Sequence, residues 1–141
     1  MSKYLNILLF SLMAFMGCED IIPDTTPPVV SIEEPNGGDE VSGIVSVEVL
    51  ANDNDKLEKV ELYTSVNGLE GTSTLDAFVH IFDWNSNTID NGECGLYAVA
   101  YDKSGNSTIS ETIQVTTFNM VTLTLNNLTQ TDVAFQFGSK S

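Results

Sequence analysis

The sequence predicts an all-β protein, an antiparallel sandwich of two sheets with about seven short strands. Apolar and polar residues alternate in several short stretches, of which residues 45–51 are the clearest. Clusters of Gly, Pro, Asn and Asp separate these stretches, as turns do. No helical period of apolar residues follows residue 18. Short alternating strands between turn signals are typical of β-sandwiches.

The first 17 residues predict a secretion signal. Lys3 provides a basic start, and the apolar run at 7–16 is too short to cross a bilayer, which takes about 20 apolar residues. Residues 15–18, Phe-Met-Gly-Cys, resemble a bacterial lipobox, which implies cleavage before Cys18 and lipid on its thiol. Several acyl chains hold a protein firmly at a membrane. We therefore expect a lipid-anchored protein of the cell envelope, at the outer membrane or cell surface; the alternative is an ordinary cleavage site with a coincidental cysteine.

An acidic linker is predicted at residues 18–28, where three prolines stiffen the chain. The first strand is predicted at residues 29–32. It follows prolines directly, and this favours an edge position in the sheet. Residues 33–38 form a turn cluster with Pro, Asn and two Gly.

The middle of the chain predicts three strands. Residues 45–51 and 59–63 alternate with the period of two that marks half-buried strands. Two glycines, Gly68 and Gly71, bracket a short reversal. Residues 77–84 are apolar on both faces, which predicts a covered sheet face or a contact with the C-terminal tail.

The strand at residues 96–101 carries two small inward residues, Ala98 and Ala100, which leave space between the sheets. Trp84 is expected to fill this space and to be the largest contributor to the core, since a Trp buries about 150–250 Å². The last strand of the sandwich is predicted at residues 109–117, where Ile and Val alternate with polar residues.

Residues 119–141 lie beyond the sandwich, which we assign to residues 29–118. They contain two alternating stretches around the turn Asn126-Asn127, a hairpin pattern. A lone hairpin is marginal in water. Three alternatives remain: the hairpin packs on the sandwich, pairs with another chain, or begins a truncated second domain.

Several motifs keep both the residue types and the spacing of a known family. They are DTTPPVVSI at 24–32, VSGIVSVEV at 41–49, ANDND at 51–55, KVELY at 59–63, FDW at 82–84, NG at 91–92 and AVAYD at 98–102 with GN at 105–106. The chain thus resembles the bacterial immunoglobulin-like domains found in tandem on secreted and surface proteins. The resemblance implies an immunoglobulin-like sandwich and leaves the function open, because one fold carries many functions.

Cys94 departs from the family pattern, which usually has an aromatic residue, commonly Tyr, at this position. In related sandwiches such a Tyr closes the corner of the sheet. Either the corner is closed differently in this chain, or Tyr97 or Tyr101 takes over part of that role.

Charge and composition exclude two classes of function. The chain has 20 acidic residues and 5 basic ones, all Lys, for a formal net charge of −15. Nucleic acids require clustered cations, so we expect no nucleic-acid partner. Catalysis has little support, because His80 is the only histidine and no Ser or Cys lies in a nucleophile motif. We predict that the chain is not an enzyme and that His80 has a structural role.

The two cysteines are predicted to have separate roles. If Cys18 carries lipid, Cys94 has no disulfide partner and is expected to be buried like a small apolar residue. One Cys with one His is too few for zinc.

Calcium is the candidate cofactor. In a sandwich of this order the loops after the second and sixth strands lie at one pole. Asp53, Asp55 and Asp102 are therefore expected to approach one another, and calcium prefers such hard oxygen ligands. The alternative is that Asp53 and Asp102 form turns by capping backbone amides.

A tyrosine surface is the candidate binding site. Tyr97 and Tyr101 share one side of their strand by alternation, and Tyr63 is a candidate on the same outer face. Exposed aromatic patches mark interaction sites, whereas cross-strand pairing on an ordinary surface is the alternative. The sequence thus indicates a lipid-anchored envelope module for adhesion, with an envelope protein or polysaccharide as partner. The alternative is a structural spacer or accessory domain of a larger protein.

Overall fold

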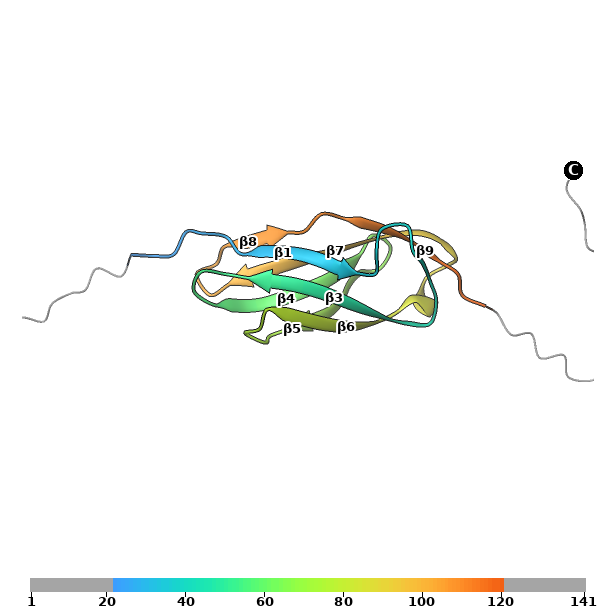
Figure 1. Cartoon of the computed structure of the whole chain (residues 1–141), viewed down its shortest axis with the longest axis horizontal. Helices are drawn as coiled ribbons and strands as arrows, with labels where there is room; N and C mark the ends of the chain where they lie inside the picture. Colours follow the sequence, from blue (N-terminus) through green and yellow to red (C-terminus); the bar gives the residue numbers. More distant parts are fainter. Residues whose placement is uncertain (1–21, 121–141) are drawn as a thin grey trace, which may run out of the picture.

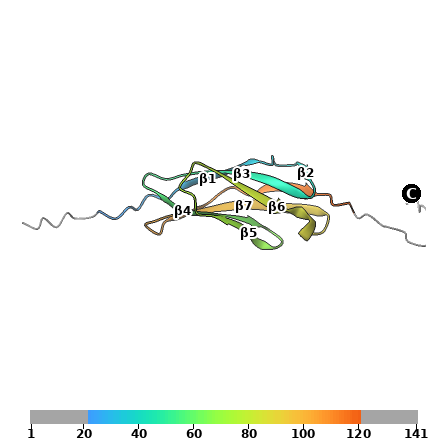
Figure 2. The same cartoon turned by 90° about the horizontal axis from the view of Figure 1, so that it is seen from below.

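The computed structural model describes residues 22–120, which form two stacked β-sheets and one short 3-10 helix (Figures 1 and 2). The strands are β1 (Val29–Glu34), β2 (Glu40–Val41), β3 (Ile44–Asn52), β4 (Leu57–Thr64), β5 (Gly68–Ser73), β6 (Val79–Asn85), β7 (Gly92–Asp102), β8 (Ser107–Ile109) and β9 (Ile113–Thr117). The helix η1 (Ser86–Thr88) follows β6.

The strand order is that of an antiparallel sandwich. One sheet has three strands in the order β1-β3-β6, and the other has six, in the order β2-β9-β7-β4-β5 with β8 paired to β7. All pairs are antiparallel except β2 with β9, which is parallel. The predicted fold class, an immunoglobulin-like β-sandwich, is confirmed.

The core lies between the two sheets and follows the predicted alternation. Trp84 is only 2 % exposed and is the largest of the fully buried side chains, as predicted. Ala98 and Ala100 on β7 also face the core, together with Val47 and Val49 on β3. The Trp84 Nε1 has no hydrogen-bond partner among the described residues.

The strand assignment differs from the prediction in three places. The two-residue strand β2, paired with β9, was not predicted. The predicted reversal at Gly68 and Gly71 is strand β5, paired along β4. Gly71 suits this path because a Cβ there would lie 3.0 Å from the Phe82 ring. The single strand predicted at 109–117 is split into β8 and β9, which pair with different parts of β7 and are joined around Ser110.

The outer face of β6 is exposed within the described part of the chain. Val79 and Ile81 on β6 are 43 % and 55 % exposed, and Phe78 just before the strand is 58 % exposed, so the described residues do not cover this face. The sequence also suggested that the C-terminal tail contacts this face. That tail is at residues 121–141, outside the described residues.

Cys94 faces the core opposite Val115, and the corner of the sheet is closed without an aromatic residue. The Thr117 hydroxyl accepts a hydrogen bond from the Gly92 N–H (3.1 Å) and donates one to the Asp90 carbonyl (2.8 Å). Tyr97 and Tyr101 lie on the opposite side of β7 from Cys94, and neither takes over this role. Of the two alternatives for the corner, the structure therefore supports a different closure.

Three predicted features lie outside the described residues: the signal segment 1–17, the lipid site at Cys18 and most of the predicted hairpin at 119–141. Within residues 22–120, no helix has the length and apolar character needed to cross a membrane.

Candidate functional site

Three tyrosines meet on the outer face of the six-stranded sheet, and we call this surface the tyrosine face (Tyr63, Tyr97 and Tyr101). The antiparallel register of β4 and β7 places Tyr63 opposite Tyr97 and Lys59 opposite Tyr101. The Tyr63 and Tyr97 rings are stacked, with centroids 5.2 Å apart and planes 6° from parallel. Lys59 Nζ lies over the Tyr101 ring, 4.4 Å from its centroid. The structure thus brings the three predicted residues together on one face.

Glu61 links the Tyr63–Tyr97 pair to the Lys59–Tyr101 pair on the tyrosine face, and no pattern in the sequence singles it out. Its carboxylate accepts hydrogen bonds from Lys59 Nζ (2.6 Å) and from the Tyr63 hydroxyl (2.9 Å). The residue is only 7 % exposed although it points to the outer side of the sheet. Alternation along β4 could have placed Glu61 on this face, but not its burial beneath neighbouring rings.

The contacts among Lys59, Glu61 and Tyr63 shift the pKa values of all three residues. The hydrogen bond to Glu61, with burial, raises the pKa of Tyr63 to about 12. Burial alone would raise the pKa of Glu61, but the hydrogen bonds from Lys59 and Tyr63 outweigh it and lower that pKa. The bond to Glu61 also raises the pKa of Lys59. Around neutral pH the cluster therefore holds one carboxylate, one ammonium group and neutral Tyr63.

Three carboxylates meet at the end of the sandwich where the chain enters it, and we call this region the acidic pole (Asp24, Asp53 and Asp102). They come from the segment before β1, the β3–β4 loop and the end of β7. One oxygen from each lies within 4.8 Å of the corresponding oxygens of the others. The sequence predicted the approach of Asp53 and Asp102 but missed Asp24, which it assigned to a linker.

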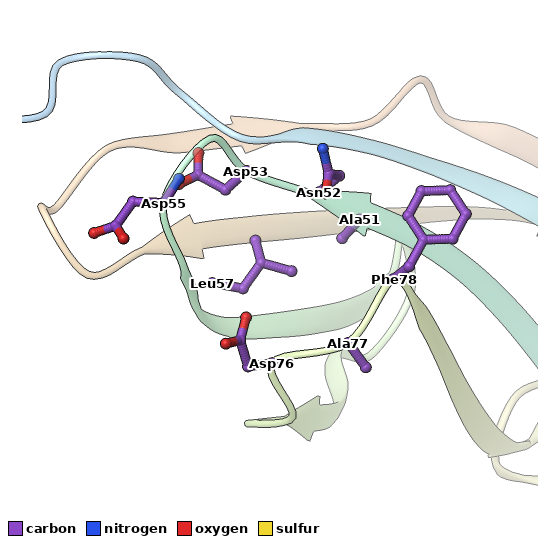
Figure 3. Close-up of a pocket in the computed structure, with 8 residues that line it drawn as sticks. All are labelled: Ala51, Asn52, Asp53, Asp55, Leu57, Asp76, Ala77 and Phe78. Carbon is purple, nitrogen blue, oxygen red and sulfur yellow. The ribbon is translucent and has the colours of Figure 1, made fainter.

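Asp55 does not belong to the acidic pole. It is exposed, and in Figure 3 its carboxylate points away from Asp53. Its backbone N–H donates to Asp53 Oδ2 (3.0 Å), which makes Asp53 a turn former as the alternative interpretation proposed. The structure therefore does not bring Asp55 together with Asp53 and Asp102, because the short turn directs successive side chains to different sides. Asp55 as a calcium ligand stays a prediction.

Asp102 closes the turn between β7 and β8. Its Oδ1 accepts from the N–H groups of Ser104 (2.9 Å) and Asn106 (2.8 Å), and its Oδ2 from the Asn106 side chain (2.7 Å). The side chain is 1 % exposed. Burial would raise the pKa of Asp102, but these hydrogen bonds together lower it.

The segment before β1 is fastened to the same loops through Asp24. Its Oδ2 accepts from the Asn54 side chain (3.1 Å), and its backbone carbonyl accepts from the Asn106 side chain (3.2 Å). Figure 3 shows the Asp53 carboxylate pointing toward this segment, drawn in blue. Beside the acidic pole an open pocket extends under the β3–β4 loop toward Asp76 and Phe78.

His80 and Cys94 are both buried in the core. His80 is 1 % exposed, with Nδ1 2.9 Å from Ser73 Oγ and no partner at Nε2 among the described residues. Burial lowers the pKa of His80 and raises that of Cys94. Neither side chain is accessible to a substrate in this arrangement.

Comparisons with known proteins agree with this geometry at the level of the fold. The fibronectin(III)-like modules of Clostridium thermocellum CbhA match with a TM-score of 0.52 at 21 % identity, over 67 % of this chain and 100 % of the module. The endo-beta-1,4-mannanase from Thermotoga petrophila matches with a TM-score of 0.55 at 17 % identity, over 69 % of this chain and 21 % of the enzyme. No curated protein matches the chain significantly.

A comparison with sequence models of protein families identifies the family of this chain. The family model described as "Bacterial Ig domain" matches residues 28–130, which is most of the chain. Domains of this kind are typically extracellular or on the cell surface. The chain therefore belongs to the bacterial Ig domain family, whose domains are non-catalytic modules and often accessory domains of larger proteins.

Proposed function

We propose that the chain is a lipid-anchored interaction module of the bacterial cell envelope, and that it binds protein or polysaccharide through the tyrosine face. The observation that carries this proposal is the preorganised aromatic surface on the six-stranded sheet. Two rings are held parallel by stacking, and the third is covered by Lys59. Ordered aromatic side chains lose little conformational entropy on binding, which is why Tyr is common in interfaces.

Exposed aliphatic side chains extend the tyrosine face on both sides. Leu69 on β5 is opposite Tyr63 and is 52 % exposed, and Ile109 on β8 is opposite Val99 and is 65 % exposed. Together with the rings they form a broad, mostly apolar surface that includes the buried acceptor Glu61. An apolar surface with few fixed polar groups suits a protein surface or the face of a sugar ring.

Binding to isolated cell envelopes tests the tyrosine face. We expect Tyr97→Ala and Tyr101→Ala to weaken binding of the full chain at least about tenfold, as loss of an aromatic anchor does. Ile81→Ala, on the outer face of the other sheet, is the control and should bind like the wild type. Pretreating the envelopes with protease distinguishes a protein partner from a polysaccharide. Equal binding of wild type and both Tyr variants would contradict the proposal.

The lipid anchor in this proposal is Cys18. This assignment depends on the resemblance of residues 15–18 to a lipobox. Expression of the full chain in a bacterium tests it. The wild type should fractionate with membranes, and mass spectrometry should find acyl chains on Cys18. Cys18→Ser should lose the acyl chains, whereas Cys94→Ser, which changes the other cysteine of the chain, should keep them. An unmodified Cys18 would remove the tether and leave the binding surface unaffected.

A structural spacer is the second candidate function, and a specific observation favours it. The tyrosine face satisfies its own contacts, because Tyr63 stacks on Tyr97, Lys59 covers Tyr101 and Glu61 has two donors. Under this alternative the Tyr variants would change the stability of the domain but not its retention on envelopes. The mannanase match, in which the similar part is 21 % of the enzyme, is in keeping with an accessory role.

A further inference from the structure

The acidic pole combines three carboxylates with an incomplete set of donors. Asp53 Oδ1 is fully buried and has no hydrogen-bond partner among the described residues. The nearby donors are used elsewhere: Asn54 serves Asp24, Asn106 serves Asp102, and the Asp55 N–H serves the other oxygen of Asp53. A buried carboxylate oxygen without a donor is costly, which indicates a missing positive partner.

No lysine neutralises the acidic pole in the described part of the chain. The ion pair found among residues 22–120 joins Lys59 to Glu61 on the tyrosine face. None of the three carboxylates therefore forms an ion pair with a lysine of the described chain.

We infer that the acidic pole binds one Ca²⁺ through Asp24, Asp53 and Asp102, and that the ion fastens the N-terminal segment to the sandwich. An ion about 2.4 Å from each ligand can join oxygens up to about 4.8 Å apart, and the three oxygens lie within 4.8 Å of one another. Calcium tolerates irregular geometry and fills its shell with backbone oxygens and water. A site of carboxylates alone, without His or Cys, disfavours zinc and other softer metals.

The position of Asp24 gives the site a mechanical consequence. Asp24 precedes β1, whereas Asp53 lies in the β3–β4 loop and Asp102 at the end of β7. An ion shared by all three joins the N-terminal segment to that loop and that strand end. The direction in which this segment leaves the domain is then fixed by calcium rather than by the Asn54 and Asn106 amide contacts alone. This inference is independent of the tyrosine face and of lipid on Cys18.

Thermal unfolding of the full chain in mild detergent tests the site, with calcium or magnesium compared to chelator at matched ionic strength. For an extracellular module we take a Kd of about 0.1–1 mM. At 10 mM calcium the Tm should then rise by at least about 5 °C. Magnesium, which demands near-ideal octahedral geometry, should raise it by less than half as much.

Two variants and a matched control locate the effect. Asp53→Asn and Asp24→Asn should each abolish most of the calcium-dependent rise in Tm. Asp24 lies outside the strands, so its variant should fold even if Asp53→Asn does not. Asp76→Asn, an exposed acid beside the neighbouring pocket, should keep the full rise. An equal Tm in calcium and chelator for the wild type, or an equal rise in all three variants, would overturn the inference.

Discussion

The two ends of the sandwich fasten the segments that enter and leave it by different chemistry. At the acidic pole the incoming segment meets Asp53 and Asp102 through Asp24. At the opposite end Asn119 fastens the outgoing segment. Its side-chain oxygen accepts from Gly43 N–H (3.3 Å) and Ser86 Oγ (3.0 Å), and its Nδ2 donates to the Ser86 and Ile89 carbonyls (2.8 and 3.3 Å). We call this second region the amide pole.

The difference shows what a side-chain amide provides that a carboxylate does not. An amide carries both donors and acceptors, so Asn119 satisfies its neighbours and itself with the protein's own groups. Ionised carboxylates only accept, and Asp53 Oδ1 lacks a donor. The amide pole should therefore be insensitive to ions and pH, whereas the acidic pole should depend on both.

Asn119→Ala should give the largest effect among the pole variants. It removes four side-chain hydrogen bonds and leaves groups around the fully buried Ser86 without partners. We expect a loss of about 2–3 kcal/mol in the free energy of unfolding by urea. The loss should be the same in calcium and in chelator. A calcium-dependent loss would break the distinction between the poles.

Acid should weaken the acidic pole through Asp102. The folded state lowers its pKa, so its contribution is fully present above the unfolded pKa, near 3.9, and is lost as pH falls through the lower folded value. Tm measured in chelator from pH 5 down to 2.5 should fall less steeply for Asp102→Asn than for the wild type. Asn119→Ala should keep the wild-type slope. Parallel curves for all three proteins would contradict this assignment.

A separate acid response should come from the core. Burial keeps the folded pKa of His80 below its unfolded value of about 6.5, so the unfolded chain takes up the proton first. Stability should therefore decline as pH falls below about 6.5, well above the range of Asp102. His80→Gln should remove this decline, as followed by urea unfolding between pH 7 and 5. An unchanged decline would assign it to another group.

The smallest effect is expected at Asp55, which the sequence placed among the calcium ligands. The exposed side chain lies outside the acidic pole, so Asp55→Asn should change stability by less than about 0.5 kcal/mol. It should also leave the calcium-dependent rise in Tm unchanged. If that rise disappeared, the ligand set predicted from the sequence would be the better one.

The sequence predicted what depends on alternation and loop position. The inward residues of β3 and β7, the burial of Trp84 and the approach of Asp53 to Asp102 all follow from period and strand order. It missed β5, because Gly-rich strands with few apolar residues resemble turns. It also missed Asp24, since a segment without regular structure gives no indication of where it packs.

The polar networks could not be predicted because they depend on contacts between distant segments. Asn119 meets Ser86 and Gly43 across 33 and 76 residues of sequence. Glu61 is buried by side chains on its own face, which alternation alone assigns to solvent. Such burial is set by side-chain conformations rather than by residue spacing.

Hydrogen–deuterium exchange of both terminal segments in one sample tests the central claim most directly. The backbone amides of residues 24–26 report on the acidic pole, since Pro27 and Pro28 have no N–H. Those of residues 116–120 report on the amide pole. We predict that calcium slows exchange at 24–26 relative to chelator and leaves 116–120 unchanged. Equal exchange at 24–26 with and without calcium, or equal slowing at both ends, would contradict this prediction.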